Sequence, residues 1–383
     1  VPVQHIRIRH GRFRLMEDQP GAVREAASLQ DIEGNLALDQ AGFRVEALTA
    51  HMRKTALSGS ALIATDRTTL KLASPSIASE DLPQILALAG VAPIQGLSVS
   101  GKVPFRLEMS IPSNGPCTAS GEFDAAILRL GTLELTALRT PFRIAKGTAT
   151  LAPLTFSAYG GQERGSATLA FARTPMGYTI KTDLDGVDVN QALSANTAAK
   201  NVLLGTGRAS ATVEGAGLDA GALAAGLHGT AVVAIKDGVV RNLPLLARIN
   251  QVLKLTGGDT KDTRFESLAG SFALGEGRAH TEDLKLQAGE LTVAAKGDIR
   301  FDLTLDFKGS ARFSRARTAA LVRVVGEARR LVNDDGELEL PFTVTGPVSS
   351  PSVGVSFSAA AGRAVKQELK RQIGRQLQKL FQK

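Results

Sequence analysis

The side chains that could carry out chemistry are few and lie far apart in the sequence. The histidines form no His-Glu-x-x-His motif and no pair at helical ligand spacing, which a metal site would need. They are His5, His10, His51, His228 and His280. The single cysteine, Cys117, follows Asn-Gly-Pro with no histidine nearby in the sequence, so we interpret it as a spectator and not as a nucleophile.

Two glycine-containing stretches resemble fragments of a dinucleotide-binding loop. They are Gly205-Thr206-Gly207 and Gly215-Ala216-Gly217, and neither lies in a strand-to-helix unit with the third glycine. The sequence contains no phosphate loop and no nucleophile elbow. Aspartate and glutamate mostly occupy outward strand positions or turns. A carbohydrate-active enzyme would need a cleft lined with aromatic residues, and the chain has no Trp and two Tyr. We therefore predict a protein that is not an enzyme and uses no cofactor or metal.

The elements that organise the sequence are strands in which apolar and polar residues alternate. Every odd position from Leu291 to Phe307 is apolar or glycine, whereas the even positions are mostly polar or charged. Because successive side chains of a strand point to opposite faces, this run has one apolar and one charged face. One continuous strand would be about 56 Å long, far beyond the usual length. The run is therefore either an unusually long strand or bends near Arg300–Asp302 through a turn of odd length.

The rest of the sequence is typical of a mainly β protein. Of its 383 residues, 43% are hydrophobic, 39 are glycine and only 4% are aromatic, as expected for many short strands joined by glycine turns. We predict a hairpin with a glycine-rich loop at Gly160–Gly165 and a hairpin turn at Asp237-Gly238. The helices that we expect are short and lie at residues 82–90, 189–204 (capped by Asp188 or Asn190), 218–227, 243–255 and 321–332.

The C-terminal end differs from the rest in charge. Residues 363–383 contain seven Lys or Arg and one Glu, so they contribute +6 of the net charge of +8 and leave +2 for the remainder. This distribution argues against a nucleic-acid-binding body. Apolar residues recur there at helical spacing, with bases on the other face, which predicts an amphipathic helix on anionic lipid or docked on the sheet. The residues assigned to it are Val365, Leu369, Ile373, Leu377, Phe381, Lys370, Arg371 and Arg375.

A series of short motifs carries a family resemblance between about Thr155 and Val353. In order they include Tyr159-Gly160-Gly161, Leu184-Asp185-Gly186-Val187, Gly205-Thr206-Gly207, Lys236-Asp237-Gly238, Lys296-Gly297-Asp298-Ile299 and Leu340-Pro341-Phe342 through Gly346-Pro347. This order resembles the C-terminal region of the AsmA-like family. The first 150 residues share only the general style of that family and of the related TamB-like proteins. We therefore predict an N-terminal β-rich part of the groove at 1–150, an AsmA-like β region at 151–358 and the basic helix at 359–383.

The resemblance implies a fold and a function. The implied fold is a long curved antiparallel sheet that forms an apolar-lined groove (a β-taco), with short interspersed helices and the C-terminal amphipathic helix. The implied protein is periplasmic and anchored in the inner membrane of a Gram-negative bacterium by a helix upstream of Val1. It supports phospholipid transport between the two membranes and outer-membrane assembly. Its implied partners are phospholipid or other lipid, the membrane and other envelope proteins, and not nucleic acid.

An apolar sheet face can line an open groove or form the core of a closed sandwich, and alternation alone does not distinguish the two. With the resemblance we predict a groove. The predicted lipid-facing residues are Leu291, Val293, Ile299, Phe301, Leu303, Leu305, Phe307, Phe272, Phe342 and Val344. The alternative is an envelope scaffold that binds protein partners through an open sheet edge.

Overall fold

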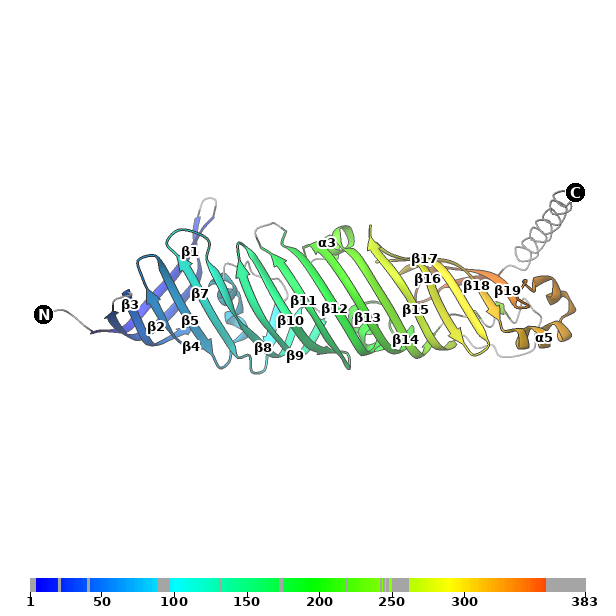
Figure 1. The fold of residues 1–383 in the computed structure, drawn as a ribbon, viewed down its shortest axis with the longest axis horizontal. Coiled ribbons are helices and arrows are strands. Elements are labelled where there is room, and N and C mark those ends of the chain that lie inside the picture. Colours follow the sequence, from blue (N-terminus) through cyan, green and yellow to red (C-terminus); the bar gives the residue numbers. More distant parts are fainter. Residues whose placement is uncertain are drawn as a thin grey trace, which may run out of the picture. The chain divides into compact units, whose positions relative to one another are not determined.

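The computed structural model describes residues 5–355 apart from 20, 21, 40, 41, 89–96, 131, 132, 172–174, 218, 219, 242, 244, 246, 247 and 250–261. The described chain is mainly β, with antiparallel strands and a few short helices, as predicted (Figure 1). It divides into two compact units, Val1–Asp185 with Thr212–Leu223 and Gly186–Ala211 with Ala224–Lys383. The predicted boundary at residue 150 falls inside a strand, Thr148–Ala158, and the predicted helix at 359–383 lies outside the described residues.

The first unit is a meander in which most strands pair with their neighbours in sequence. The exception is β6, which pairs with β8 and not with β5 or β7, while β5 pairs with β7 and β7 with β8. The helical elements are η1 (Ser79–Asp81) and α1 (Leu82–Leu88). The strands are β1 (His5–Gln19), β2 (Ala22–Asp39), β3 (Gly42–Met52), β4 (Thr55–Ile63), β5 (Arg67–Ser74), β6 (Leu97–Ser100), β7 (Phe105–Pro112), β8 (Thr118–Leu130), β9 (Leu133–Ala145), β10 (Thr148–Ala158), β11 (Gly161–Ala170) and β12 (Gly177–Asp188).

The second unit continues the same pattern. From β14 onward, each strand again pairs with the next. The helical elements are α2 (Val189–Asn196), α3 (Ala220–Gly226), α5 (Arg315–Val324) and η2 (Gly326–Leu331), of which α3 spans the division between the units. The strands are β13 (Leu203–Ala216), β14 (His228–Val240), β15 (Thr263–Gly275), β16 (Arg278–Ala288), β17 (Leu291–Arg300), β18 (Thr304–Phe313), β19 (Leu338–Pro347) and β20 (Ser352–Val355).

Local expectations are confirmed in part. The run from Leu291 to Phe307 bends at residues 301–303, a turn of odd length in which Leu303 has φ 66° and donates its N–H to the Arg300 carbonyl at 2.9 Å. The predicted hairpin is also present, but its turn is Tyr159-Gly160 and β11 already begins at Gly161, inside the predicted loop. The cap of α2 is Asp188, whose carboxylate accepts the Gln191 N–H at 2.9 Å, but the helix ends at Asn196 and not at 204.

The predicted hairpin at Asp237-Gly238 is wrong. Strand β14 runs through both residues, and Gly238 pairs directly with Phe265 of β15. A Cβ on Gly238 would lie 2.2 Å from the ring of Phe265, so this glycine makes room for an aromatic ring on the neighbouring strand. The glycine serves cross-strand packing here, not chain reversal.

Each unit has its own apolar core on one face of its strands. In the first unit α1 contacts β2, and its Leu82 and Ile85 belong to a buried cluster with residues of β2–β9. In the second unit α5 and η2 contribute Leu321, Ala328 and Leu331 to the cluster formed by β14–β19. No helix among the described residues combines the length and hydrophobicity that crossing a bilayer requires.

Candidate functional site

Strand register in the first unit places apolar side chains of successive strands next to one another. One such row crosses the strands from β1 to β12, and each member is the direct cross-strand partner of the next. Its members are Ile6, Leu36, Val45, Ala61, Leu70, Met109, Ala119, Ile144, Ala149, Leu169 and Tyr178. With strands about 4.8 Å apart, the ten steps of this row extend about 48 Å. Unit 1 therefore has an apolar track perpendicular to its strands.

A second row lies beside the first on the same face. Its members are Leu48, Gly59, Leu72, Leu107, Gly121, Phe142, Leu151, Ala167 and Ile180. The Phe142 ring covers Gly121, where a Cβ would lie 2.8 Å from the ring, and it stacks on Phe105 with centroids 6.3 Å apart. The two rows make the track at least two side chains wide.

Helix α1 and this face line a partly open apolar cavity of about 200 Å³. The segment of α1 contributes Ile77, Leu82, Ile85 and Leu86, and the strands contribute Phe105, Leu107, Phe123, Leu128, Leu138, Phe142, Ile144, Ala149, Leu151 and Leu169, joined by Phe171. Every lining residue is apolar. An apolar cavity of about 150 Å³ stays dry and binds benzene, so this one has room for a somewhat larger hydrocarbon group.

Polar contacts hold the start of α1 against the β3–β4 turn. The buried carboxylate of Asp81 accepts the Lys54 backbone N–H at 3.0 Å, and the Lys54 ammonium lies 2.9 Å from Glu80. The buried Thr55 hydroxyl accepts the Ala78 N–H at 3.0 Å. These bonds fix one end of the element that covers the cavity.

The apolar face of β11 also carries a buried carboxyl, Glu163, which is only 2% exposed. It lies between Phe156 of β10 and Leu184 of β12, and its Oε1 accepts the Thr182 hydroxyl at 2.8 Å. Its Oε2 has no hydrogen-bond partner among the described residues. Burial raises the pKa of this carboxyl, while the Thr182 bond opposes the shift. Sequence reasoning missed Glu163 because Gly161–Gly165 resembles a loop, whereas it is a strand whose alternation would have placed Glu163 inward.

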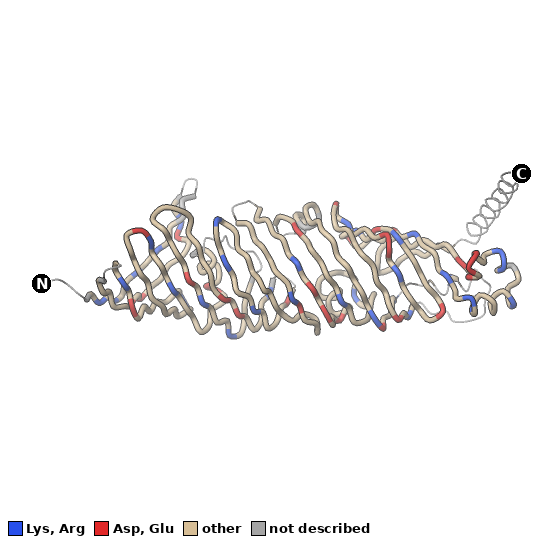
Figure 2. The backbone as a smooth tube through the Cα atoms, in the orientation of Figure 1, with Lys and Arg blue, Asp and Glu red and all other residues tan. Residues whose placement is uncertain are grey.

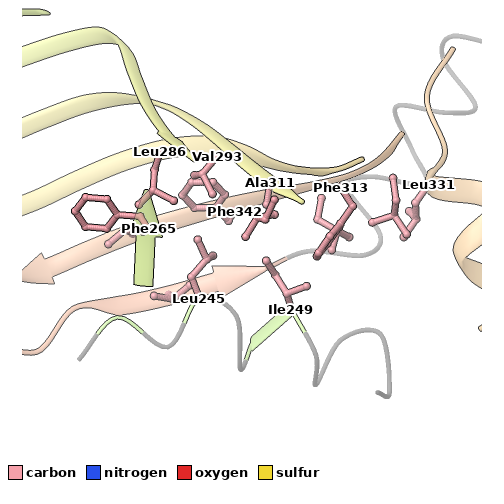
Figure 3. Close-up of a cluster of buried hydrophobic side chains, with 14 of the residues drawn as sticks. Leu245, Ile249, Phe265, Leu286, Val293, Ala311, Phe313, Leu331 and Phe342 are labelled. Atoms are coloured by element: carbon pink, nitrogen blue, oxygen red, sulfur yellow. The ribbon is translucent and has the colours of Figure 1, made fainter. Parts of the chain in front are cut away.

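The ten predicted lipid-facing residues belong to the second unit, and half of them are covered. Leu291, Val293, Phe307, Phe342 and Val344 are buried members of one packed cluster. Leu245 and Ile249 lie across from the strands and point toward them (Figure 3). These five residues therefore form a closed core in this conformation.

The other predicted residues are less buried. Ile299 and Leu305 are direct cross-strand partners and pack against the edge of the cluster. Phe272 is the partner of Ala231 and is half-buried, as are Phe301 and Leu303 in the turn between β17 and β18. Five of the ten residues are thus buried in a closed core, and the other five are half-buried. The predicted helix residues Val365, Leu369, Lys370, Arg371, Ile373, Arg375, Leu377 and Phe381 lie outside the described part.

Charged residues are distributed along the strands of both units (Figure 2). Cross-strand ion pairs include Lys71–Glu108 at 3.4 Å and Lys296–Glu282 at 3.2 Å. His280 bonds to Asp298 at 2.8 Å and to Glu282 at 3.0 Å, and these bonds raise the pKa of the imidazole. Within the described residues, no group of His, Cys, Asp and Glu is arranged to hold a metal ion, and Cys117 is exposed.

A family model described as the AsmA family matches residues 122–284. This match confirms the family prediction over that stretch, which begins earlier and ends earlier than the motif series at 155–353. The AsmA family is a bacterial envelope family, and the match is consistent with a lipid-related function. Comparisons with curated proteins and with solved structures found no match.

Proposed function

We propose that this chain, which matches the AsmA family over residues 122–284, is a non-enzymatic lipid-handling protein of the Gram-negative periplasm. In this proposal it is held at the inner membrane, carries phospholipid toward the outer membrane and so supports outer-membrane assembly. The observation that carries the proposal is the apolar cavity of about 200 Å³ in the first unit, which continues into the two rows of apolar residues.

Physical chemistry supports this assignment. Each methylene group of an acyl chain costs about 0.8 kcal/mol when it is exposed to water, so a chain of 16 carbons costs roughly 13 kcal/mol. A carrier must therefore shield the acyl chain from water. This task requires apolar surface and no reactive groups. A cavity with no polar lining residue suits an acyl chain and offers nothing to a sugar or a nucleotide.

The proposal assigns the two units different roles. The first unit receives the acyl chain, because its apolar face contains the cavity. In the second unit the same kind of face is filled by its own side chains, including Leu245 and Ile249. Lipid would reach Val293 or Phe342 only if the side chains of Leu245 and Ile249 no longer covered them.

Photocrosslinking in cells tests the proposal with a matched pair of neighbouring positions. Leu151 lines the cavity, whereas the adjacent Thr150 is exposed on the opposite face of β10. A photoreactive residue at Leu151 should capture phospholipid, identified by mass spectrometry, and one at Thr150 should not. Absence of phospholipid at both positions, together with lipid-free purified protein, would refute the proposal.

A further inference from the structure

The first strand, β1, has one edge without a partner among the described strands. It pairs with β2 only, over His5–Gln19. Along such an edge, about half of the backbone N–H and C=O groups point away from the sheet. The last strand, β20, is only 4 residues long, a common way to blunt an edge, whereas β1 has 15 residues.

One face of β1 carries a row of arginines. Arg7, Arg9, Arg12 and Arg14 are all exposed. The register shift between Ile8 and Gly11, where His10 has φ 53°, inserts one residue and keeps all four on the same face. Arg14 lies 3.5 Å from Glu25 of β2. The strand therefore presents positive charge at every second position, interrupted by one bulge.

The other face of β1 is apolar and incompletely covered. Ile6 is 49% exposed and Phe13 is 46% exposed, while Ile8 and Leu15 are half-buried. Both exposed residues belong to the apolar side, because their partners Leu36 and Leu29 lie on it. An additional strand along β1 would cover these side chains and extend the apolar face by one strand.

We propose that the edge of β1 binds an extended segment of a partner protein in which acidic and apolar residues alternate. The backbone groups of the edge favour a strand over bilayer hydrocarbon, because a strand can hydrogen-bond to them and hydrocarbon cannot. The arginine row requires carboxylates opposite it, and the other face requires apolar side chains. A second copy of β1 would place arginine against arginine, and β20 (Ser352–Val355) has no acidic residue. The inference does not depend on the proposed lipid function.

A labelled peptide of about ten residues that alternates Glu and Val is the probe, and its counterpart alternates Lys and Val. The full chain should bind the Glu peptide and not the Lys peptide. The triple variant Arg7→Glu/Arg9→Glu/Arg12→Glu should bind the Glu peptide about tenfold more weakly and acquire affinity for the Lys peptide. This exchange of preference cannot arise from misfolding.

A second triple variant controls for net charge. Lys236→Glu/Lys285→Glu/Lys308→Glu changes exposed residues of β14, β16 and β18 by the same total charge and should leave peptide binding unchanged. N-methylation of every second peptide amide should abolish binding when the methyl groups lie on the amides that point toward β1. It should preserve binding when they lie on the intervening amides, as strand pairing requires.

Three results would overturn the proposal. The first is equal binding of the Glu peptide by the natural chain and the β1 variant. The second is binding to vesicles of phosphatidylcholine and phosphatidylglycerol with no binding of either peptide, which would make the arginine row a membrane contact. The third is a dimer crosslinked through β1 that excludes the peptide.

Discussion

Filling the cavity in the first unit should stabilise that unit, and Ala149→Leu is the substitution that tests this. Ala149 lies on the apolar face of β10, is 5% exposed and lines the cavity. Leucine adds three carbons, which at about 0.8 kcal/mol per buried carbon gives an upper limit of about 2.4 kcal/mol. At about 24 cal/mol per Å³, the whole cavity of about 200 Å³ corresponds to roughly 5 kcal/mol, so one leucine fills it only in part.

Ala119→Leu is the matched control. Ala119 lies in the same row as Ala149, separated from it by Ile144, and is 4% exposed, but it does not line the cavity. The same three carbons must there be forced into a packed face, which typically destabilises a protein by about 1–3 kcal/mol. The two variants should therefore shift the free energy of unfolding in opposite directions.

Urea unfolding, monitored by the hydrogen exchange of peptides from β9–β11, measures this difference in the first unit alone. Ala149→Leu should raise the urea midpoint and Ala119→Leu should lower it. Ala149→Leu should also weaken the binding of a small apolar probe such as benzene, because it occupies the same space. A loss of stability in both variants would refute the reasoning, since it would mean that residue 149 has no free volume beside it.

Two further predictions concern a glycine and the buried carboxyl. Gly309→Ala should destabilise the second unit by about 1–3 kcal/mol in urea unfolding, because its Cβ would lie 2.3 Å from the Ala294 carbonyl and 2.7 Å from the Phe342 ring. Gly275→Ala, with no atom within 4 Å of its Cβ, should be neutral or slightly stabilising, and equal losses would contradict this account. For Glu163, burial raises the pKa in the folded state, so the folded protein binds its proton more tightly than the unfolded chain does. The free energy of unfolding should therefore fall as pH rises from the ordinary glutamate value through the folded one, and Glu163→Gln should remove that part of the dependence. Identical urea midpoints for both proteins at every pH between about 4 and 8 would exclude this role.

The alternation of apolar and polar residues predicted the strands well, because it depends only on residues that are neighbours within one strand. The odd positions from Leu291 to Phe307 lie on one face, and the parity persists through the turn at 301–303 since Ile299 and Leu305 are direct partners. A turn of two residues would have broken this parity, so the expectation of an odd-length turn followed from geometry alone.

The wrong predictions concern glycine, which can either allow the chain to turn or make room for a neighbouring side chain. Asp237-Gly238 is a strong turn signal, but Gly238 accommodates the ring of Phe265 inside a continuous strand. Likewise, the glycines at 161 and 165 suggested a loop and hid Glu163. A Cβ on Gly165 would lie 2.6 Å from Glu163 Oε1, so this glycine leaves the space that the carboxyl occupies. Such tertiary reasons for a glycine are not visible in the local sequence.

Whether an apolar face is open or covered could not be predicted either. Val293 and Leu151 occupy the same kind of position on their strands, yet Val293 is packed in a cluster with Leu245 and Ile249 and Leu151 lines a cavity. The difference depends on segments that are distant in sequence. The alternation of apolar and polar residues within one strand contains no information about those segments. The family resemblance predicted a groove at residues of the second unit, which stays a prediction, and the cavity lined by Leu151 lies in the first unit.

Bulges explain how an apolar face remains continuous across so many strands. In β3, Phe43 and Val45 face the apolar side from odd positions, whereas Leu48, Ala50 and Met52 do so from even ones. The register shifts between Val45 and Leu48, where Ala47 has φ 49°. Because one extra residue reverses the parity of a strand, a bulge at this point returns the later residues to the apolar face. In β3, a change from odd to even apolar positions therefore does not mean that the strand ends. Together with the positive φ of Ala47, it marks the bulge at which the strand bends and continues.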